Sequence, residues 1–257
     1  MSHISYSELK VWNDCPFKHK LQYIDKNKVF TSTEYTCFGI AIHETCEKSL
    51  LKEITEEQHD EYFENKFKQE LTLMQEQVEI DNVLVSDMVT QGKAILSELY
   101  ESITAYLGEY EVVATEQPLY ERIEKLDFEY NFKGFIDLVL RTPDGKTHII
   151  DWKTCSWGWD TKKKSDAMVT YQLTYYKNFY AQKFGIDPKM VETHFALLKR
   201  TAKKNRVEFF RVSSGTKKIE NANTLLTKAI LAIKNEKYIK NRLSCNGCEF
   251  YKTEFCK

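Results

Sequence analysis

The sequence predicts one compact α/β domain with a helical insertion, on three observations. Residues 40–108 are polar, rich in Glu, Gln, Lys and Leu, and free of proline, which is typical of helices. Residues 111–153 hold short apolar runs separated by turn residues, which is typical of strands. Apolar residues at helical spacing then return, most clearly over 216–237. Since no repeat or Gly/Ser linker interrupts the 257 residues, we expect a single domain over 1–257.

The elements follow in order. The first helix covers residues 5–23 and is interrupted at Pro16, because proline cannot donate a helical hydrogen bond. A helical insertion occupies about 44–108, and a core of strands and one helix (168–184) occupies about 110–212. A C-terminal region of about 216–257 holds the amphipathic helix and a cysteine cluster. The expected strands are 111–116, 128–132, 135–140, a strand beginning at 148, 194–198 and 207–212.

Composition excludes several classes of protein. Hydrophobic residues are 42% and charged residues 29%, so the chain can bury a core and is neither disordered nor a disulfide-stabilised mini-protein. It begins without a secretory signal and has no run of 18 apolar residues, so we expect no membrane partner. Seven cysteines in such a chain indicate a reducing, cytoplasmic setting, where clustered cysteines bind metals more often than they form disulfides.

Charge is segregated although the net charge is only −1. Residues 44–82 hold twelve acidic and four basic residues, whereas residues 199–242 hold thirteen basic and three acidic residues. The basic segment could present a cationic face to phosphates. The alternative is that both segments are solvated helix faces.

Two aspartates and a lysine carry the clearest chemistry. Asp137 lies inside the apolar run Gly134–Leu140, and Asp151 and Lys153 are two residues apart on a predicted strand, so they project to one face. Two carboxylates on neighbouring strands can hold Mg²⁺ or Mn²⁺, with a lysine beside an activated water. The alternative is a simple ion pair between Asp151 and Lys153.

Three further residues support this interpretation. Gln172 and Tyr176 are at positions i and i+4 of the next helix and share one face, where they could also be ordinary core residues. His43 follows Gly39 at the start of the helical region, and a lone histidine is either structural or a metal ligand.

Taken in order, Gly39-x3-His43, Gly134-Phe135-Ile136-Asp137, Asp151-x-Lys153 and Gln172-x3-Tyr176 resemble the motifs of RecB-type nucleases of the PD-(D/E)XK superfamily. The resemblance extends from about residue 5 to residue 256. It implies a restriction-endonuclease-like core, with a central mixed β-sheet flanked by helices.

The resemblance also implies roles. His43, Asp137, Asp151 and the carbonyl of Trp152 would bind Mg²⁺ or Mn²⁺. Lys153 would position the attacking water and stabilise charge on the phosphate, and Gln172 and Tyr176 would support Lys153 and the DNA backbone. Glu116 matches an acidic position found in some members, and Asp151 replaces the glutamate found in others.

The chain ends in Cys245-x2-Cys248-x7-Cys256, and Cys15 could supply a fourth thiolate. Fe–S-containing relatives, the CRISPR-associated RecB-like and AddB-like nucleases, place one cysteine before the core and three after it around a 4Fe–4S cluster. The resemblance implies such a cluster here. Because the last gap is longer than expected, Zn²⁺ is the alternative.

The predicted function is that of a metal-dependent deoxyribonuclease, an exonuclease on single-stranded or end-bearing DNA. Trp157, Trp159 and Lys162–Lys164 could line a single-stranded path, or the tryptophans could cap the core. The expected setting is recombination, repair, or phage or CRISPR DNA processing, with a protein partner from such a system. The alternative is a non-catalytic, Fe–S-stapled DNA-binding module.

Overall fold

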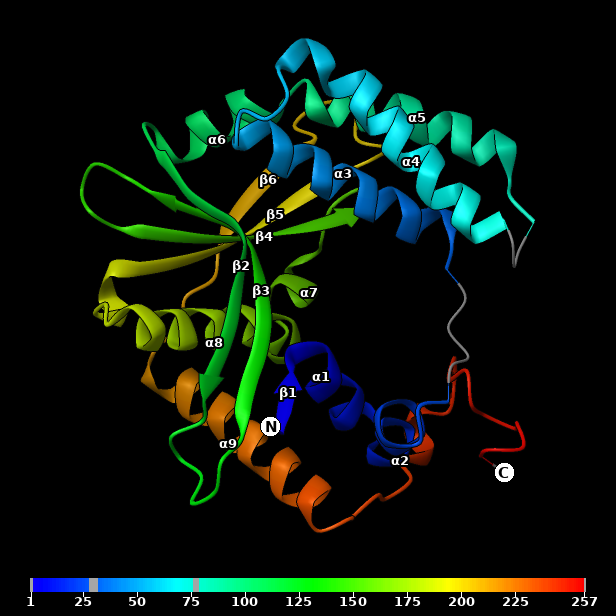
Figure 1. Ribbon diagram of the computed structural model, residues 1–257, viewed down its shortest axis with the longest axis vertical. Coiled ribbons are helices and arrows are strands. Elements are labelled where there is room, and N and C mark those ends of the chain that lie inside the picture. The colour runs from blue at the N-terminus through cyan, green and yellow to red at the C-terminus, as the bar shows by residue number, and fades with distance from the viewer. Residues whose placement is uncertain (1, 28–31, 76–78, 257) are drawn as a thin grey trace. The chain divides into compact units, whose positions relative to one another are not determined.

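The computed structural model describes residues 2–27, 32–75 and 79–256, and the chain divides into two compact units (Figure 1). Unit 1 comprises Met1–Phe30, Pro118–Gly134 and Ser214–Lys257, and unit 2 comprises Thr31–Gln117 and Phe135–Ser213. Strands β2 (Glu111–Arg122) and β3 (Asn131–Arg141) each pass from one unit into the other.

Unit 2 holds the central sheet and the predicted insertion. Its strands follow the order β3, β4 (Thr147–Cys155), β5 (Val191–Lys199), β6 (Val207–Arg211), and β2 pairs with β3. The β4–β5 pair is parallel, and the β3–β4 and β5–β6 pairs are antiparallel, so the sheet is mixed. The helices of this unit are α3 (Glu34–Leu50), α4 (His59–Gln75), α5 (Asn82–Leu96), α6 (Leu99–Leu107), α7 (Thr161–Ser165) and α8 (Ala167–Phe184), with short 3₁₀ turns η2 (Glu56–Gln58) and η3 (Pro188–Met190).

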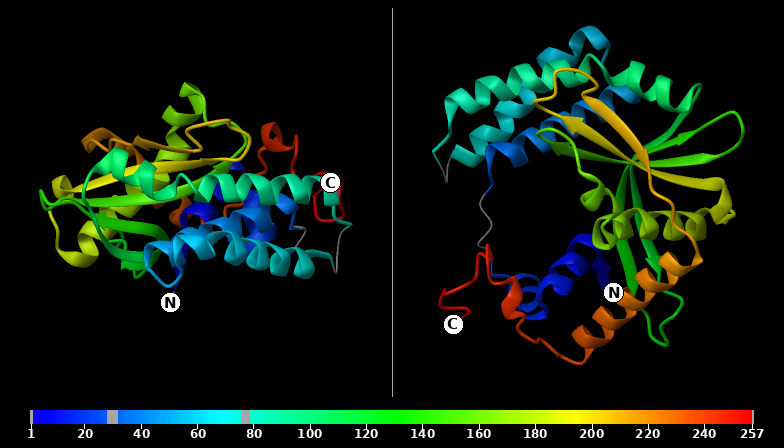
Figure 2. Two further views of the ribbon diagram at one scale, coloured as in Figure 1. Left: turned by 90° about the horizontal axis from the view of Figure 1, so that it is seen from above. Right: turned by 180° about the vertical axis from the view of Figure 1, so that it is seen from behind.

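The two faces of this sheet are covered by different helices (Figures 1 and 2). Helices α3 to α6 contribute Phe38, Phe63 and Ile95 to a buried core shared with Ile150 and Trp152 of β4. Helix α8 lies on the opposite side of the strands. The expectation of a mixed sheet flanked by helices is therefore confirmed.

Local sequence explains where the helices that frame the sheet begin and end. Thr33 caps α3 by accepting a hydrogen bond from the Thr36 amide, and Asp166 caps α8 in the same way through the Val169 amide. Gly185, with φ of 63°, ends α8 in the left-handed conformation that glycine adopts without strain.

Unit 1 is built around helices from both ends of the chain. It contains β1 (His3–Ser5), α1 (Tyr6–Asp14), α2 (Pro16–His19), a π-helical turn η1 (Lys20–Ile24), α9 (Thr216–Lys234) and the 3₁₀ turn η4 (Arg242–Ser244). Strand β1 pairs in parallel with the first residues of β3. Helix α9 buries Ala222, Leu226, Ala229 and Ile230, which recur at helical spacing.

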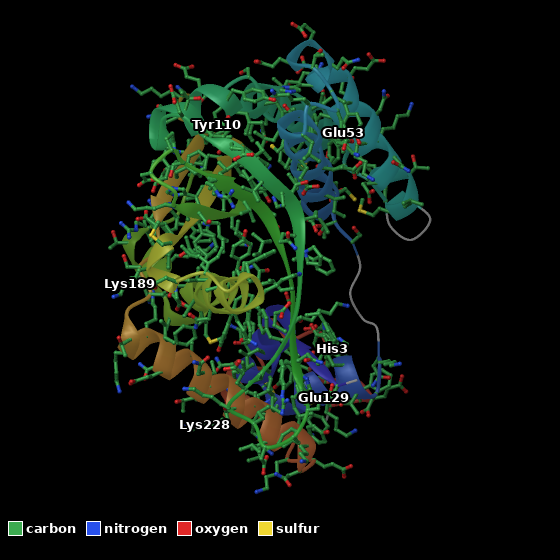
Figure 3. The ribbon with its side chains drawn as sticks, turned by 60° about the vertical axis from the view of Figure 1, so that its left-hand side comes forward. His3, Glu53, Tyr110, Glu129, Lys189 and Lys228 are labelled. Atoms are coloured by element: carbon green, nitrogen blue, oxygen red, sulfur yellow. The ribbon has the colours of Figure 1, made fainter. Side chains whose placement is uncertain are left out.

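Two sequence predictions need correction. The strands expected at 128–132 and 135–140 form one strand, because the extended backbone continues through Lys133 and Gly134. Strand β2 runs six residues beyond the expected end at 116, and it accommodates Pro118, which lacks a ladder donor, beside β3. The predicted helix break at Pro16 is confirmed. Figure 3 labels Tyr110, just before β2, and Glu129, in the connection from β2 to β3.

Among the described residues, none of the helices combines the length and the apolar character that a membrane crossing requires.

Candidate active site and cysteine-lined cavity

Asp137 and Asp151 lie side by side on strands β3 and β4. Leu138 pairs with Ile150 in the antiparallel ladder. Asp137, one residue before Leu138, therefore lies opposite Asp151, one residue after Ile150, and the two side chains share a face of the sheet. The backbone N–H of Trp152 donates to Asp137 Oδ2 at 2.7 Å, which fixes this carboxylate against the β4 backbone. Burial raises the pKa of both carboxyl groups to about 6, and for Asp151 the charge of Asp137 contributes further.

Lys153 forms an ion pair with Asp151 on the same strand face. Burial lowers the pKa of the ammonium group, but Asp151 and Asp137 outweigh burial and hold the pKa above its ordinary value. Lys153 is therefore a cation at neutral pH. It can donate hydrogen bonds to a phosphate or a water but cannot accept a proton.

Helix α8 brings Gln172 and Tyr176 to the same carboxylate. The Gln172 side-chain amide donates to Asp151 Oδ1 at 2.6 Å and to the Tyr176 hydroxyl at 3.2 Å. The i, i+4 spacing allows one amide to reach both groups. Gln172 therefore orients Asp151 directly. The resemblance implies instead that Gln172 supports Lys153.

Two more acidic side chains extend the cluster, and one of them is absent from the sequence-based predictions. Glu116 of β2 adopts a positive φ of 45° and hydrogen-bonds Glu47 of α3. Burial, followed by the charges of Glu116 and Asp137, raises the pKa of Glu47 to about 8. Glu47 lies four residues after His43, so helical spacing is the signal that could have identified it.

His43 completes the group from α3. Its Nε2 is buried and has no hydrogen-bond partner among the residues that the structure describes. Burial and the charge of Lys153 lower the pKa of His43 to about 4, so the imidazole is neutral near pH 7. Helix α3 passes close to the end of β4, since a Cβ at Gly39 would lie 3.6 Å from Thr154 Oγ1.

These donors fit a hard divalent cation. Four carboxylates and a neutral imidazole with a buried, unpartnered nitrogen suit Mg²⁺ or Mn²⁺. No three of their donor atoms lie within 4.8 Å of one another, so at most two of them reach one ion as the side chains stand, and water ligands would fill the other positions of Mg²⁺. The Trp152 carbonyl stays a predicted ligand, and the Trp152 N–H contact places its backbone beside Asp137.

The two tryptophans of the loop after β4 lie in different environments. Trp159 packs against Phe195 and Phe210, with ring centroids 5.2 and 5.9 Å away, and the Lys163 ammonium lies 4.5 Å above its ring. Trp159 thus follows the core-capping alternative. Trp157 is 71% exposed and keeps a free ring face for stacking.

The four cysteines of the predicted cluster line one cavity in unit 1. The cavity has a volume of about 300 Å³, and Cys15, Cys245, Cys248 and Cys256 all contribute to its wall. The C-terminal segment is held at this place by Asn241, which donates from its backbone N–H to Cys15 Sγ at 3.3 Å and from its side chain to the Asp14 carbonyl at 2.8 Å.

The other cysteines lie apart from this cavity. Cys37 and Cys46 are buried and Cys155 is half-buried, as expected of ordinary core and near-core thiols.

Comparison with known proteins agrees with this geometry. Residues 3–253 match the sequence model of the PD-(D/E)XK nuclease superfamily. A solved structure titled "Crystal structure of SSO0001" aligns with 14% identity and a TM-score of 0.39 over 95% of this chain and 92% of that chain, a similarity too low to carry an argument. No curated protein matches the chain.

Proposed function

The chain belongs to the PD-(D/E)XK nuclease superfamily, whose members are metal-dependent nucleases, and we propose that it hydrolyses DNA that is single-stranded or has free ends. The carrying observation is the convergence of Glu47, Glu116, Asp137 and Asp151 with a single cation, Lys153. Such a cluster would repel a phosphodiester unless a divalent ion were bound, because the negative charges outnumber the positive one. A simple Asp–Lys ion pair would leave the other carboxylates unexplained.

Each residue has a chemical role in this proposal. Asp137 and Asp151 would hold Mg²⁺ or Mn²⁺, with His43, Glu47, Glu116 and the Trp152 carbonyl as further ligands. The bound ion would supply a water of lowered pKa and neutralise charge on the phosphate. Lys153, which stays protonated, would donate hydrogen bonds to the phosphate as negative charge develops. Gln172 would keep Asp151 in place through its hydrogen bond.

The preference for single strands rests on the loop that follows β4. Trp157 is exposed in the loop that leads to Lys162–Lys164, and bases stack on tryptophan rings while phosphates pair with lysines. We also propose exonuclease action on such DNA, in recombination, repair, or phage or CRISPR DNA processing in the cytoplasm.

We also propose that the cysteine-lined cavity holds a 4Fe–4S cluster. All four cysteines line one cavity, but no three of their sulfur atoms lie within 4.8 Å of one another. A tetrahedral zinc site would bring its sulfurs to about 3.8 Å, given Zn–S bonds of about 2.3 Å. The wider spacing favours a 4Fe–4S cluster over one Zn²⁺ ion. Such a cluster would join the two ends of the chain.

The nuclease proposal is tested with end-labelled single-stranded and duplex DNA and Mn²⁺ or Mg²⁺. We expect the wild type to cut, and Asp151→Asn and Lys153→Ala to lose at least about 10²–10³-fold in rate while staying folded. Asp25→Asn and Lys20→Ala break another Asp–Lys pair, joined at 2.5 Å, and should cut normally. A wild type that binds DNA but cuts neither substrate would instead support the non-catalytic module.

The cluster proposal is tested by purification without oxygen, followed by iron, sulfide and zinc analysis. We expect about four irons per chain in the wild type and in Cys155→Ser, and loss of iron in Cys248→Ser. One zinc and no iron per chain would refute the cluster.

A further inference from the structure

Three side chains with metal-ligand chemistry converge at the start of β4 and β5, on elements of unit 2. His148 pairs with Glu192 and Ile150 pairs with His194 in the parallel ladder, so the three side chains lie on one face of the sheet. Their donor atoms all lie within 4.8 Å of one another, the one such group of three in the described part of the chain. His148 Nδ1 and His194 Nε2 are 3.0 Å apart.

The outer nitrogens of both imidazoles are held by hydroxyl groups. Thr142 donates its hydroxyl proton to Asp144 at 2.5 Å, so its oxygen accepts the Nε2–H of His148 at 3.0 Å. This tautomer leaves a lone pair on His148 Nδ1, directed at the second ring. Outer hydrogen bonds of this kind commonly orient histidine ligands of metals.

His194 is oriented in the same manner from α6. Its Nδ1 lies 3.0 Å from the Tyr106 hydroxyl, and the Tyr106 ring stacks on Phe209 with centroids 5.1 Å apart. When His194 donates from Nδ1 to that hydroxyl oxygen, its Nε2 also offers a lone pair. Two fixed rings thus direct their inner nitrogens at one point, and a metal ion would bind there once the proton that His194 otherwise donates from Nε2 to His148 has moved to its own Nδ1.

Burial keeps both imidazoles in the neutral form that can bind a metal ion. Both rings are buried, and burial lowers the pKa of His194 to about 3 and the pKa of His148 below its ordinary value, so both are neutral near pH 7. The Glu192 carboxylate pairs with Lys146 at 3.5 Å and Arg211 at 3.3 Å, two cations that a bound metal ion would displace from it.

A cleft of about 440 Å³ gives access to the group. It is lined by Tyr106, Thr142, Asp144, His148, Glu192, His194 and Arg211, among others. Lys189, labelled in Figure 3, lies in the η3 turn directly before β5, which is the end of the strand that carries Glu192.

We propose that His148, Glu192 and His194 bind Zn²⁺ at a site distinct from the carboxylate cluster, with a fourth position open to the cleft. Two histidines and a glutamate are an established ligand set for zinc with an open position. Nitrogen ligands of tetrahedral Zn²⁺ are about 3.3 Å apart, so the rings need to separate by only a few tenths of an ångström. Asp151 and Lys153 lie on the opposite face of β4, and none of the three ligands has a role in the proposed nuclease chemistry.

The direct test is nitrogen NMR of the histidine rings of the full-length protein during titration with Zn²⁺. The chain has six histidines, and His148→Gln and His194→Gln assign the two signals. We expect Zn²⁺ to convert His148 Nδ1 and His194 Nε2 to metal-bound nitrogens together. Signals that stay unchanged while Zn²⁺ saturates other sites would show that the rings share only a proton, and this would overturn the proposal.

Affinity measurements separate the third ligand from its surroundings. In competition with a chelator, Glu192→Gln should weaken this site more than 100-fold, and Tyr106→Phe about 10–100-fold, as expected for a ligand and for its hydrogen-bond partner. Glu208→Gln is the matched control, because Glu208 lies on the neighbouring strand and also pairs with two cations, Lys164 and Lys199. Equal affinity in wild type and Glu192→Gln would refute the three-ligand site. Neither readout depends on DNA cleavage, so this proposal can fail or hold independently of the nuclease.

Discussion

Replacing Glu47 by glutamine tests whether the acidic cluster binds the catalytic ion as a unit. The pKa of Glu47 is about 8, so about a tenth of this side chain is ionised at pH 7 and about nine tenths at pH 9. A divalent ion that requires the ionised form must displace about 0.9 proton from Glu47 at pH 7. The apparent affinity for Mn²⁺ should therefore rise about tenfold between pH 7 and pH 9.

Asp137 and Asp151 contribute little to this effect. Their pKa values of about 6 leave about 0.1 proton on each at pH 7, so the wild type should release about 1.1 protons per Mn²⁺ and Glu47→Gln about 0.2. Calorimetric titration in two buffers of different ionisation enthalpy measures this number directly. The same titration is repeated with Asp151→Asn. The heat that is lost in this variant is the heat of Mn²⁺ binding at the active site.

A matched control lies on the same helix. Glu44 accepts a hydrogen bond from Tyr62 at 2.7 Å and pairs with Lys66 at 3.0 Å, and these contacts outweigh burial and lower its pKa. Glu44→Gln should therefore release as many protons as the wild type. If Glu47→Gln also keeps the wild-type proton release and pH dependence, Glu47 does not take part in metal binding, and the argument from its raised pKa is refuted.

Three further outcomes are expected. Gln172→Ala removes the amide that orients Asp151 and should lower the single-turnover cleavage rate about 10–100-fold, with the fold intact by circular dichroism. Gly92→Ala would place a Cβ 2.3 Å from the buried Phe63 ring and should destabilise the protein by about 1–3 kcal/mol in urea unfolding. Gly215→Ala, which meets nothing within 4 Å at the N-cap of α9, should cost less than about 1 kcal/mol. Without divalent ions, the free energy of unfolding of the wild type should fall by about 1–3 kcal/mol relative to that of Glu47→Gln as pH rises from 4 to 8. The sign follows because the pKa of Glu47 is raised in the folded state, so the folded wild type binds this proton more tightly and loses that advantage as Glu47 ionises. The comparison with Glu47→Gln cancels the opposite contribution of His43 and His194, whose pKa values are lowered. Urea titrations of both proteins at pH 4, 6 and 8 with a chelator check this.

The sequence predicted the elements better than their junctions. Periodicity located α8 and α9 closely, because capping residues and apolar spacing agree there. The single strand β3 was divided in two because Lys133 and Gly134 interrupt the apolar run, although their extended backbone continues the ladder. The order of strands and the presence of two compact units depend on contacts distant in sequence, which no local pattern encodes.

The residues of the carboxylate cluster and of the His148–Glu192–His194 group differ in how far the sequence could reveal them. Asp151 and Lys153 are charges in an apolar run, which makes them conspicuous. Glu47 lies in a segment where acidic residues are frequent, so nothing local separates a buried carboxylate from a solvated one. His148 and His194 are 46 residues apart, and only the parallel pairing of β4 with β5 brings them together.

The alternation of side chains along β4 keeps the two kinds of metal chemistry apart. His148, Ile150 and Trp152 share one face, where the apolar pair enters the core with α3 to α6, and Asp151 and Lys153 share the other. A shift of β5 by one residue would turn Glu192 and His194 to the face opposite His148. In the present register the Phe195 ring lies 5.8 Å from the Lys153 ammonium. Such a shift would also move Phe195 to the other face of the sheet. The large apolar side chains of the β4–β5 pair therefore hold the register on which the His148–Glu192–His194 group depends. Asp151 lies on the other face of β4, where its carboxylate faces α8 and accepts the hydrogen bond from Gln172.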